Sequence, residues 1–280
     1  MVSLKKLANG FEYLEVVNLS ASAKIALQGG HIFDYTPTDK EPLLWLSEAS
    51  NFKYGESIRG GIPICWPWFG MHTTDTTLPQ HGFARTSLWT HTQTIEKKDA
   101  TQITLKLQSS SKTKELFPYK FELTLIIDIG EKLQLQLITT NTDTKAFTIT
   151  QALHTYFNIS DTNHITIKGL KNKTYFDALD AHYKKQVKDI KINKEVDRVF
   201  QDTEKEIVLQ DTNSKISISR EGSSSVVIWN PWIDKCSRMS AMKEDSYKTF
   251  VCIESANALS DAREIESHTS HTLQTTINYI

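Results

Sequence analysis

The chain has 280 residues, of which 39% are hydrophobic and 23% are charged, and these fractions are typical of a globular protein with a sizeable core. Its formal net charge is -1, which excludes a global basic field that would draw it to nucleic acid or to an anionic membrane surface. No apolar run is long enough to span a bilayer, and the N-terminal MVSLKKLANGFEYLEV lacks the continuous apolar segment of a secretory signal.

The first unusual stretch, RGGIPICWPWFG, begins at Arg59 and is followed after a polar break by LPQHGFAR, which ends at Arg85. Gly60 and Gly61 follow Arg59 and allow the backbone to turn tightly or to approach a ligand closely. The prolines restrict the segment, so it has few conformations to lose on ordering. The two guanidinium groups therefore lie on a stiff scaffold and suit sugar hydroxyls or a phosphate.

The same stretch contains an amide, an imidazole and several flat aromatic side chains. Gln80 and His81 supply the polar groups, and we expect Trp68 and Phe83 to form apolar walls near a bound sugar. Aromatic faces suit the C–H side of a sugar ring, and amides suit its hydroxyls. Each residue alone would fit an ordinary buried cluster, but the whole set favours a binding site.

Beyond this stretch, apolar and polar residues alternate with a period of two, which predicts half-buried β-strands. Turn residues separate the strands, and helical patterning is confined to short turns within 178–191 and 234–242. We therefore predict an all-β fold, a large antiparallel β-sandwich that forms a single domain over residues 1–280. The predicted strands are 103–108, 121–129, 132–139, 147–157, 164–169, 206–210, 215–221, 225–229, 250–254 and 272–279.

Two candidate catalytic residues lie in these strands. His154 is part of TQALHTYF, where a half-buried imidazole can be held in place and its pKa tuned. Glu254 ends the apolar run FVCI, and a carboxylate there is costly unless it has partners or a task. A positioned carboxylate and imidazole can act as general base and general acid. Asp197, in EVDRVF, is a further candidate that could bind a hydroxyl or pair with basic neighbours.

The remaining histidines and the cysteines carry weaker signals. His31 follows two glycines and is expected to be structural. His268 and His271 have metal-compatible spacing, but with no third ligand nearby we expect no metal site. The three cysteines are widely spaced and form no C-x-x-C pair, which predicts free thiols and a cytoplasmic location.

Six motifs, taken in order along the chain, resemble those of one known family. They are RGGIPICWPWFG, LPQHGFAR, ALHTYF, EVDRVF, VVIWNPW and FVCIESANA. The resemblance is to the D-hexose-6-phosphate mutarotases, also called glucose-6-phosphate 1-epimerases, a branch of the aldose 1-epimerase superfamily. It extends from about Gly30 to the C-terminus and implies a β-sandwich of the galactose-mutarotase type. One departure is Ser255, because relatives often have proline after the glutamate.

The resemblance implies a role for each candidate residue. It places the catalytic acid on His154 and the catalytic base on Glu254. The implied substrate-binding positions are Arg59, Gln80, His81, Arg85 and Asp197, with His81 in a supporting role. The implied partner is a small phosphorylated sugar bound by a monomer, and no cofactor, metal, nucleic acid or membrane is involved.

In the implied reaction, the base removes the O1 proton, the acid protonates the ring oxygen, and the open aldehyde rotates about C1–C2 before the ring recloses. Ordinary pKa values of about 4.3 for Glu and about 6.5 for His predict an ionised Glu254, whose charge would keep His154 partly protonated. Two alternatives stay open. One is a mutarotase of free aldoses, whose arginines pair with acidic residues such as Glu56. The other is a non-catalytic sugar-binding module.

Overall fold

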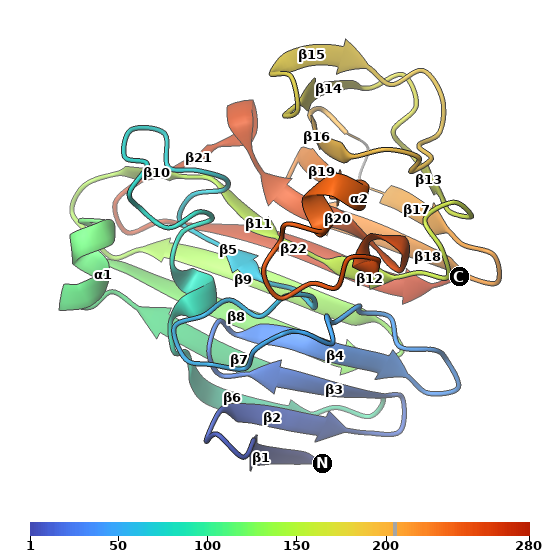
Figure 1. The fold of residues 1–280 in the computed structure, drawn as a ribbon. Helices are drawn as coiled ribbons and strands as arrows, with labels where there is room; N and C mark the ends of the chain where they lie inside the picture. Colours follow the sequence, from blue (N-terminus) through green and yellow to red (C-terminus); the bar gives the residue numbers. More distant parts are fainter. Residues whose placement is uncertain (204–205) are drawn as a thin grey trace.

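The computed structural model describes residues 1–203 and 206–280. Within these residues the chain is folded mainly into antiparallel strands, which form two eight-stranded sheets, one four-stranded sheet and one two-stranded sheet (Figure 1). This confirms the predicted all-β fold. The helical elements are short. They are α1 (Ser111–Leu116), α2 (Trp232–Cys236) and the 3-10 turns η1 (Ala84–Thr86), η2 (Ser246–Lys248) and η3 (Leu259–Asp261).

One eight-stranded sheet, here called the framework sheet, contains the most regular strands. In β8 the residues Phe121, Leu123 and Leu125 are buried, and those between them are half-buried. This alternation follows from the pleat, which points successive side chains to opposite faces. In spatial order the framework strands are β13 (Thr166–Lys168), β17 (Glu206–Gln210), β18 (Lys215–Glu221), β22 (Ser270–Tyr279), β9 (Leu133–Asn141), β8 (Phe121–Gly130), β7 (Ala100–Gln108) and β6 (Thr90–Glu96).

The second eight-stranded sheet, here called the site sheet, is less regular. Every residue of its strands β19 and β20 is buried, because both faces of these strands are covered. The main path is β15 (His182–Lys185), β14 (Thr174–Asp177), β16 (Val196–Phe200), β19 (Ser225–Asn230), β20 (Phe250–Asn257), β11 (Gln151–Leu153) and β5 (Ile64–Cys65), and β12 (Tyr156–Asn158) also pairs with β20.

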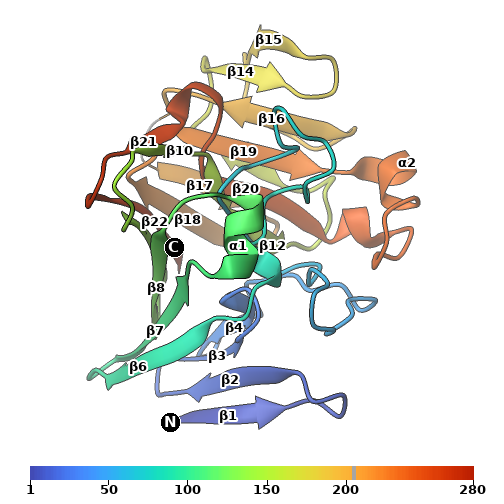
Figure 2. The same ribbon diagram turned by 90° about the vertical axis from the view of Figure 1, so that its left-hand side faces the viewer.

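Two smaller sheets complete the fold. The four-stranded sheet consists of β1 (Val2–Lys6), β2 (Glu12–Val17), β3 (Ala21–Ala26) and β4 (His31–Pro37), and the two-stranded sheet pairs β10 (Phe147–Ile149) with β21 (Arg263–Ile265). The four-stranded sheet lies at one end of the molecule and β14–β16 lie at the other (Figures 1 and 2).

The main core is shared by three sheets. It contains Val16 and Ile25 of the four-stranded sheet, Leu125 of the framework sheet, and Ile228 and Ile253 of the site sheet. The opposite face of the site sheet carries a second, smaller cluster. This double coverage leaves β19 and β20 with no solvent-facing side, as is usual for strands in the middle of a layered fold.

The structure differs from the sequence prediction at the N-terminus, within 147–157, and at the strands β5, β6, β14, β15, β16 and β21, which lie outside the predicted ranges. The four strands β1–β4 are not predicted, because their alternating pattern is short and interrupted by polar residues. The single strand expected over 147–157 is divided into β10, β11 and β12, since the chain pairs first with β21 and then with β20. Between β11 and β12 the amide of Thr155 bonds back to the carbonyl of Leu153, which interrupts the ladder.

Candidate active site

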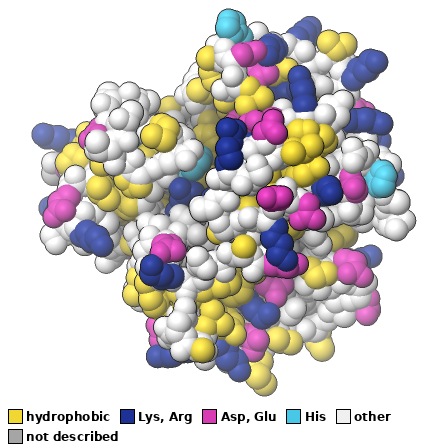
Figure 3. All heavy atoms as spheres, viewed as in Figure 1, with side chains coloured by type: hydrophobic (Ala, Val, Ile, Leu, Met, Phe, Trp, Pro, Cys, Tyr) yellow, Lys and Arg dark blue, Asp and Glu magenta, His cyan; other side chains and the backbone are white. Residues whose placement is uncertain are grey.

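A cleft of about 900 Å³ opens over the outer face of the site sheet. In the space-filling view the surface is hollowed, with histidine and basic side chains visible in the hollow (Figure 3). All seven residues proposed from the sequence line this one cleft. They are Arg59, Gln80, His81, Arg85, His154, Asp197 and Glu254.

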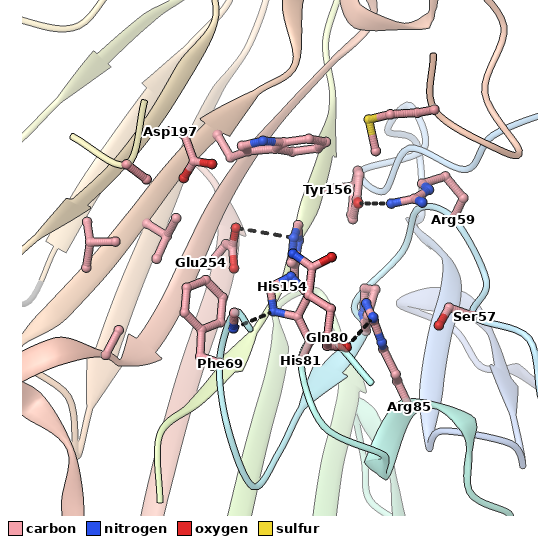
Figure 4. A pocket seen from close by; sticks show the side chains of 18 of the residues that line it. Ser57, Arg59, Phe69, Gln80, His81, Arg85, His154, Tyr156, Asp197 and Glu254 are labelled. Atoms are coloured by element: carbon pink, nitrogen blue, oxygen red, sulfur yellow. Dashed lines mark hydrogen bonds and ion pairs between the residues drawn. The ribbon is translucent and has the colours of Figure 1, made fainter. Parts of the chain in front are cut away.

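Strand register brings His154 and Glu254 together. Leu153 lies opposite Ser255 and Tyr156 lies opposite Cys252, so the position opposite Glu254 is that of His154. The imidazole Nε2 is 3.4 Å from the carboxylate Oε1 (Figure 4). Ser255 continues β20 in register, so the departure from the family motif leaves the strand intact.

Both groups of this pair are buried and keep an unused polar atom. Glu254 is only 1% exposed and His154 is 8% exposed. Among the described residues, Glu254 Oε2 and His154 Nδ1 have no hydrogen-bond partner. Buried polar atoms are nearly always satisfied in folded proteins, so two unsatisfied atoms in one cleft mark it as a place for a polar ligand.

Burial shifts the proton affinity of both groups. Burial, with a smaller contribution from the charge of Asp197, raises the pKa of Glu254 well above its ordinary value. Burial, repulsion from the His81 ring when that ring is protonated, and the positive fields of Arg85 and Arg59 lower the pKa of His154 well below its ordinary value. The expectation that Glu254 would keep His154 protonated is therefore wrong for this structure, because burial and the nearby arginines have the larger effect.

His81 is held beside His154 by a constrained turn. Its φ is 64°, in the left-handed region that few residues other than glycine adopt. Its Nδ1 accepts a hydrogen bond from the amide of Gly70 at 3.0 Å, so the neutral ring carries its proton on Nε2. Loss of solvation and the neighbouring Arg85 and Arg59 lower the pKa of His81 to about 3. The neutral ring is thus a hydrogen-bond donor, 5.8 Å from the His154 ring between centroids.

The next residue explains why this turn is so tight. Gly82 has a φ of 70°, and a Cβ at this position would lie 2.0 Å from the carbonyl oxygen of Trp66. Gly61 is similar, because its Cβ would lie 2.2 Å from the carbonyl oxygen of Ile32. Such distances are sterically impossible, so glycine is required at both positions. The prediction that glycine after Arg59 allows a tight backbone is confirmed at Gly61, whereas close approach to a ligand stays a prediction.

Two arginines form a cationic end of the cleft. Arg59 Nη1 donates to the hydroxyl of Tyr156 at 3.5 Å, and Arg85 Nη2 donates to the carbonyl oxygen of Gln80 at 2.6 Å (Figure 4). Neither guanidinium forms an ion pair with a carboxylate in the part of the chain that the structure describes. The alternative that Glu56 neutralises them is wrong, because Glu56 pairs with Lys53 at 2.6 Å.

The other end of the cleft contains an acidic residue with a basic neighbour. Asp197 lies on β16 opposite Trp229 of β19. Lys235 Nζ, from α2, is 3.8 Å from Asp197 and 2.9 Å from Glu195. Burial raises the pKa of Asp197, while Lys235 acts in the opposite direction. In Figure 4, Asp197 and Glu254 lie on one side of His154, and Arg59 and Arg85 lie on the other.

The expected apolar walls are wrong. Trp68 and Phe83 are buried in the main core and do not line the cleft. Their neighbour Phe69 lines it instead, together with Tyr156 and Trp229. The segment from Arg59 to Arg85 points some aromatic side chains into the core and others into the cleft, and its sequence pattern does not show which side chains do which.

Tyr156 is the main residue that the sequence prediction misses. Its ring stacks on His154 at 4.9 Å with an interplanar angle of 13°. It lies two positions after His154, and side chains two apart on a strand share a face, so this spacing was the available signal. Lys235 is also missed, and nothing in its local sequence points to the cleft.

Several other expectations are testable. His31 is buried, its Nε2 lies 2.8 Å from the carbonyl oxygen of Gly60, and burial lowers its pKa to about 4, so its structural role is confirmed. Cys65, Cys236 and Cys252 are free and buried, as predicted.

Across residues 1–203 and 206–280, no group of three His, Cys, Asp or Glu side chains is arranged to bind a metal ion. No helix in these ranges has both the length and the apolar character needed to cross a membrane.

Comparison with known proteins identifies relatives along nearly the whole chain. The family model described as aldose 1-epimerase matches residues 14–278. A protein of Escherichia coli (strain K12) named "Putative glucose-6-phosphate 1-epimerase" is 33% identical over 277 residues, which cover 98% of this chain and 92% of that protein. A protein of the same name from Salmonella typhimurium is 34% identical over 256 residues, covering 90% of this chain and 85% of that protein.

Solved structures agree with this relationship. A crystal structure described as that of "a putative mutarotase (YeaD) from Salmonella typhimurium" superposes with a TM-score of 0.93 at 32% identity, covering 99% of this chain and 93% of that chain. The galactose 1-epimerase of Lactobacillus acidophilus has a TM-score of 0.77 at 12% identity, covering 100% and 98%. The second likeness concerns the fold alone and confirms the galactose-mutarotase type of β-sandwich.

Proposed function

Because the chain belongs to the aldose 1-epimerase family, we propose that it interconverts the α and β anomers of a hexose 6-phosphate, with glucose 6-phosphate favoured. An aldose 1-epimerase exchanges the anomers of a sugar at C1. The names of the Escherichia coli and Salmonella typhimurium relatives support glucose 6-phosphate as the substrate. The phosphate itself is supported by one observation in particular, the two cleft arginines that lack a carboxylate partner among the described residues.

In this proposal Glu254 is the general base. Its buried carboxylate takes the proton from O1 of the sugar as the ring opens. The raised pKa of Glu254 suits this task, because a base is most effective when its pKa approaches the working pH. When the ring recloses from the other face of the aldehyde, Glu254 returns the proton to O1. No net proton is gained or lost.

His154 is the general acid and protonates the ring oxygen as the C1–O5 bond breaks. Its pKa is lowered in part by the fields of Arg85 and Arg59. A bound phosphate carries about -1.5 to -2 charge near neutral pH and would offset these fields. Substrate binding therefore favours the protonated His154 that the reaction requires. His81, a neutral donor beside it, stabilises negative charge on the sugar oxygens.

The order of groups along the cleft fits the order of atoms in the substrate. A hexose 6-phosphate has its phosphate next to C5, the ring oxygen between C5 and C1, and O1 beyond C1. The cleft has the arginines at one end, His154 in the middle, and Glu254 with Asp197 on the far side (Figure 4). Asp197 then accepts a hydrogen bond from a hydroxyl near C2.

The two alternatives are less well supported. A free-aldose mutarotase has no need of two arginines without acidic partners at the remote end of the cleft. A non-catalytic sugar-binding module has no need of a buried carboxylate with a raised pKa, which costs stability at neutral pH. A matched acid and base at 3.4 Å favours catalysis over binding alone.

Replacing either arginine tests the phosphate. Hydrogen bonds to charged groups are worth about 1.5–3 kcal/mol, or roughly one to two decades of affinity. We expect Arg59→Ala and Arg85→Ala each to raise KM for glucose 6-phosphate by that factor, because phosphate contacts are similar in the ground and transition states. Glucose has no phosphate, so its kcat/KM should change far less. Lys53→Ala removes a nearby cation that already has a partner and is the control. Equal losses for both sugars would favour the free-aldose alternative.

A further inference from the structure

The cleft extends beyond the acid–base pair onto an apolar surface, here called the shelf, formed by Phe176, Ala178, Val199, Val227 and Leu259. The volume of about 900 Å³ lies near the upper end of the range of roughly 300–1,000 Å³ that is usual for sites holding drug-sized ligands. A hexose phosphate is smaller than such ligands. The shelf therefore offers room that glucose 6-phosphate does not require.

Strand register places the shelf next to the base. Val227 lies opposite Glu254, Val199 lies opposite Val227, and Phe176 lies opposite Val199. Neighbouring strands are about 4.7–4.9 Å apart, so this row runs away from Glu254 for roughly 14 Å. His154 lies at the opposite end of the same row, toward the arginines. In the proposed binding mode, the shelf therefore begins beside Glu254, at the end of the sugar that carries C1.

The chemistry of ring opening decides which sugar atom faces the shelf. O1 must carry a free hydroxyl, because its proton is removed in the reaction, so no substituent on O1 can occupy the shelf. With the phosphate at the arginines and O1 at Glu254, the next carbon along the ring is C2. A group attached to C2 therefore points past Glu254 toward Val227 and Val199.

Two polar groups, one acceptor and one donor, lie beside the shelf and could bind the N–H and the carbonyl of an amide. Asp197 is an acceptor on the same face as Val199, two residues away on β16. Lys235 Nζ, 3.8 Å from Asp197, is a donor that also lines the cleft. An amide N–H requires an acceptor, its carbonyl requires a donor, and an acyl methyl requires an apolar surface. These three requirements are met side by side.

The outermost residue of the shelf is itself unusual. Leu259 is 41% exposed and has a φ of 56°, a conformation that branched or bulky residues rarely adopt. The turn that contains Leu259 is held in place by Asp261, which accepts hydrogen bonds from Ser224, Ser225 and Asn257. A strained and exposed apolar residue fixed at the rim of a cleft is well placed to contact a ligand.

We propose that the shelf, with Asp197 and Lys235, is a subsite for an acylamino group on C2, so that 2-acylamino-2-deoxyhexose 6-phosphates are substrates. This inference rests on the proposed anomer exchange of hexose 6-phosphates and extends its substrate class. Asp197 accepts from the amide N–H, Lys235 donates to the acyl oxygen, and the acyl methyl packs on Val199 and Leu259.

Anomer exchange of N-acetylglucosamine 6-phosphate and glucose 6-phosphate, followed by NMR, tests the subsite. We expect both sugars to be exchanged by the unaltered protein. Ala178→Phe fills the shelf from an exposed position, and we expect kcat/KM for the acetylated sugar to fall at least tenfold relative to glucose 6-phosphate, since such pockets discriminate by about 10- to 200-fold. Leu179→Phe changes the neighbouring exposed residue, which does not line the cleft, and is expected to leave the ratio unchanged.

Two further variants test the polar and rim contacts. Lys235→Met keeps the length of the side chain but removes the donor, and Leu259→Gly removes the rim contact at a φ that suits glycine. Both are expected to lower kcat/KM mainly for the acetylated sugar. The subsite is disproved if glucose 6-phosphate is exchanged and the acetylated sugar is not, or if Ala178→Phe affects both equally. Exchange of neither sugar would instead overturn the proposed function.

Discussion

The framework sheet and the site sheet have the same number of strands but differ in how far the side chains on their second face are buried. In β8 of the framework sheet, buried residues alternate with half-buried ones. In β20 of the site sheet, all eight residues from Phe250 to Asn257 are buried. The difference arises because the second face of the site sheet carries a cluster of buried aromatic and apolar side chains, several of which form the floor of the cleft.

The polar residues of the two sheets differ in the same way. On the framework sheet, Glu122 pairs with Lys106 at 2.6 Å and with Gln108 at 2.7 Å across the solvent-facing side. On the site sheet, Glu254 Oε2 and His154 Nδ1 are buried without a partner among the described residues. Satisfied polar groups maintain a fold, whereas unsatisfied buried ones cost stability and are retained where a ligand will satisfy them.

The largest expected effect is on catalysis in the site sheet. Glu254→Gln keeps the size of the side chain but cannot accept a proton, so we expect kcat for anomer exchange to fall roughly 10²- to 10⁴-fold. Glu122→Gln is the matched control in the framework sheet and should leave kcat unchanged. Near-normal exchange by Glu254→Gln would show that the carboxylate of the site sheet is not the base.

The same two variants are expected to change stability in opposite directions. The pKa of Glu254 is raised by burial, so folding favours its protonated form, and its contribution is lost as the pH rises from about 4.5 through the folded pKa. Glu254→Gln should therefore be more stable than the parent at neutral pH. The pKa of Glu122 is lowered by Lys106 and Gln108, so its contribution is present above pH 4.5 and lost below it. Glu122→Gln should be less stable at neutral pH, and urea unfolding at several pH values measures both.

A cavity in the framework sheet should affect stability without affecting catalysis. Leu135, on β9, is 1% exposed and packs in the main core. Leu135→Ala is expected to lower the free energy of unfolding by roughly 2–5 kcal/mol, while kcat per folded molecule stays the same. Gln136→Ala, on the other face of β9, is the control and should be nearly neutral. A large loss of kcat in folded Leu135→Ala would mean that the two sheets are not separable in function.

The smallest expected effect concerns the contact between the arginine end and the imidazole. Tyr156→Phe keeps the ring stacked on His154 but removes the hydroxyl that accepts from Arg59. This hydrogen bond is long, at 3.5 Å, so we expect it to contribute no more than a typical net hydrogen bond, about 0.5–1.5 kcal/mol, and KM for glucose 6-phosphate should rise roughly two- to tenfold. Tyr175→Phe makes the same change on the core face of the site sheet and should leave KM unaltered. An equal rise in both variants would contradict a specific role for Tyr156.

The same contrast explains how much of the fold the sequence predicts. Alternation identifies the framework strands β7, β8 and β9 because each has one apolar face and one half-exposed face. It does not identify β1–β4, which are short and stabilised by pairing with one another, nor the breaks in 147–157, which depend on changes of partner strand. Tertiary pairing, rather than local pattern, determines these elements.

For the site, residue type in an unsuitable context is the useful signal. Glu254 and His154 stand out because a carboxylate and an imidazole interrupt buried runs. Asp197 lies on β16 and Lys235 lies on α2, and these elements are distant in the sequence, so the contact between the two side chains cannot be read from local sequence. The error over Trp68 and Phe83 has a similar cause, since both aromatic rings turn toward the core.

The most direct test of catalysis by the site sheet is NMR exchange spectroscopy of glucose 6-phosphate in D₂O with the purified protein. The proposed ring opening and closure predict an α–β exchange rate that rises in proportion to protein concentration, is faster than for glucose, and leaves the protons on C1 and C2 unexchanged with solvent. Exchange at the buffer rate alone would contradict the proposed activity. Deuterium appearing at C2 would show that a different reaction, through an enediol, takes place in the cleft.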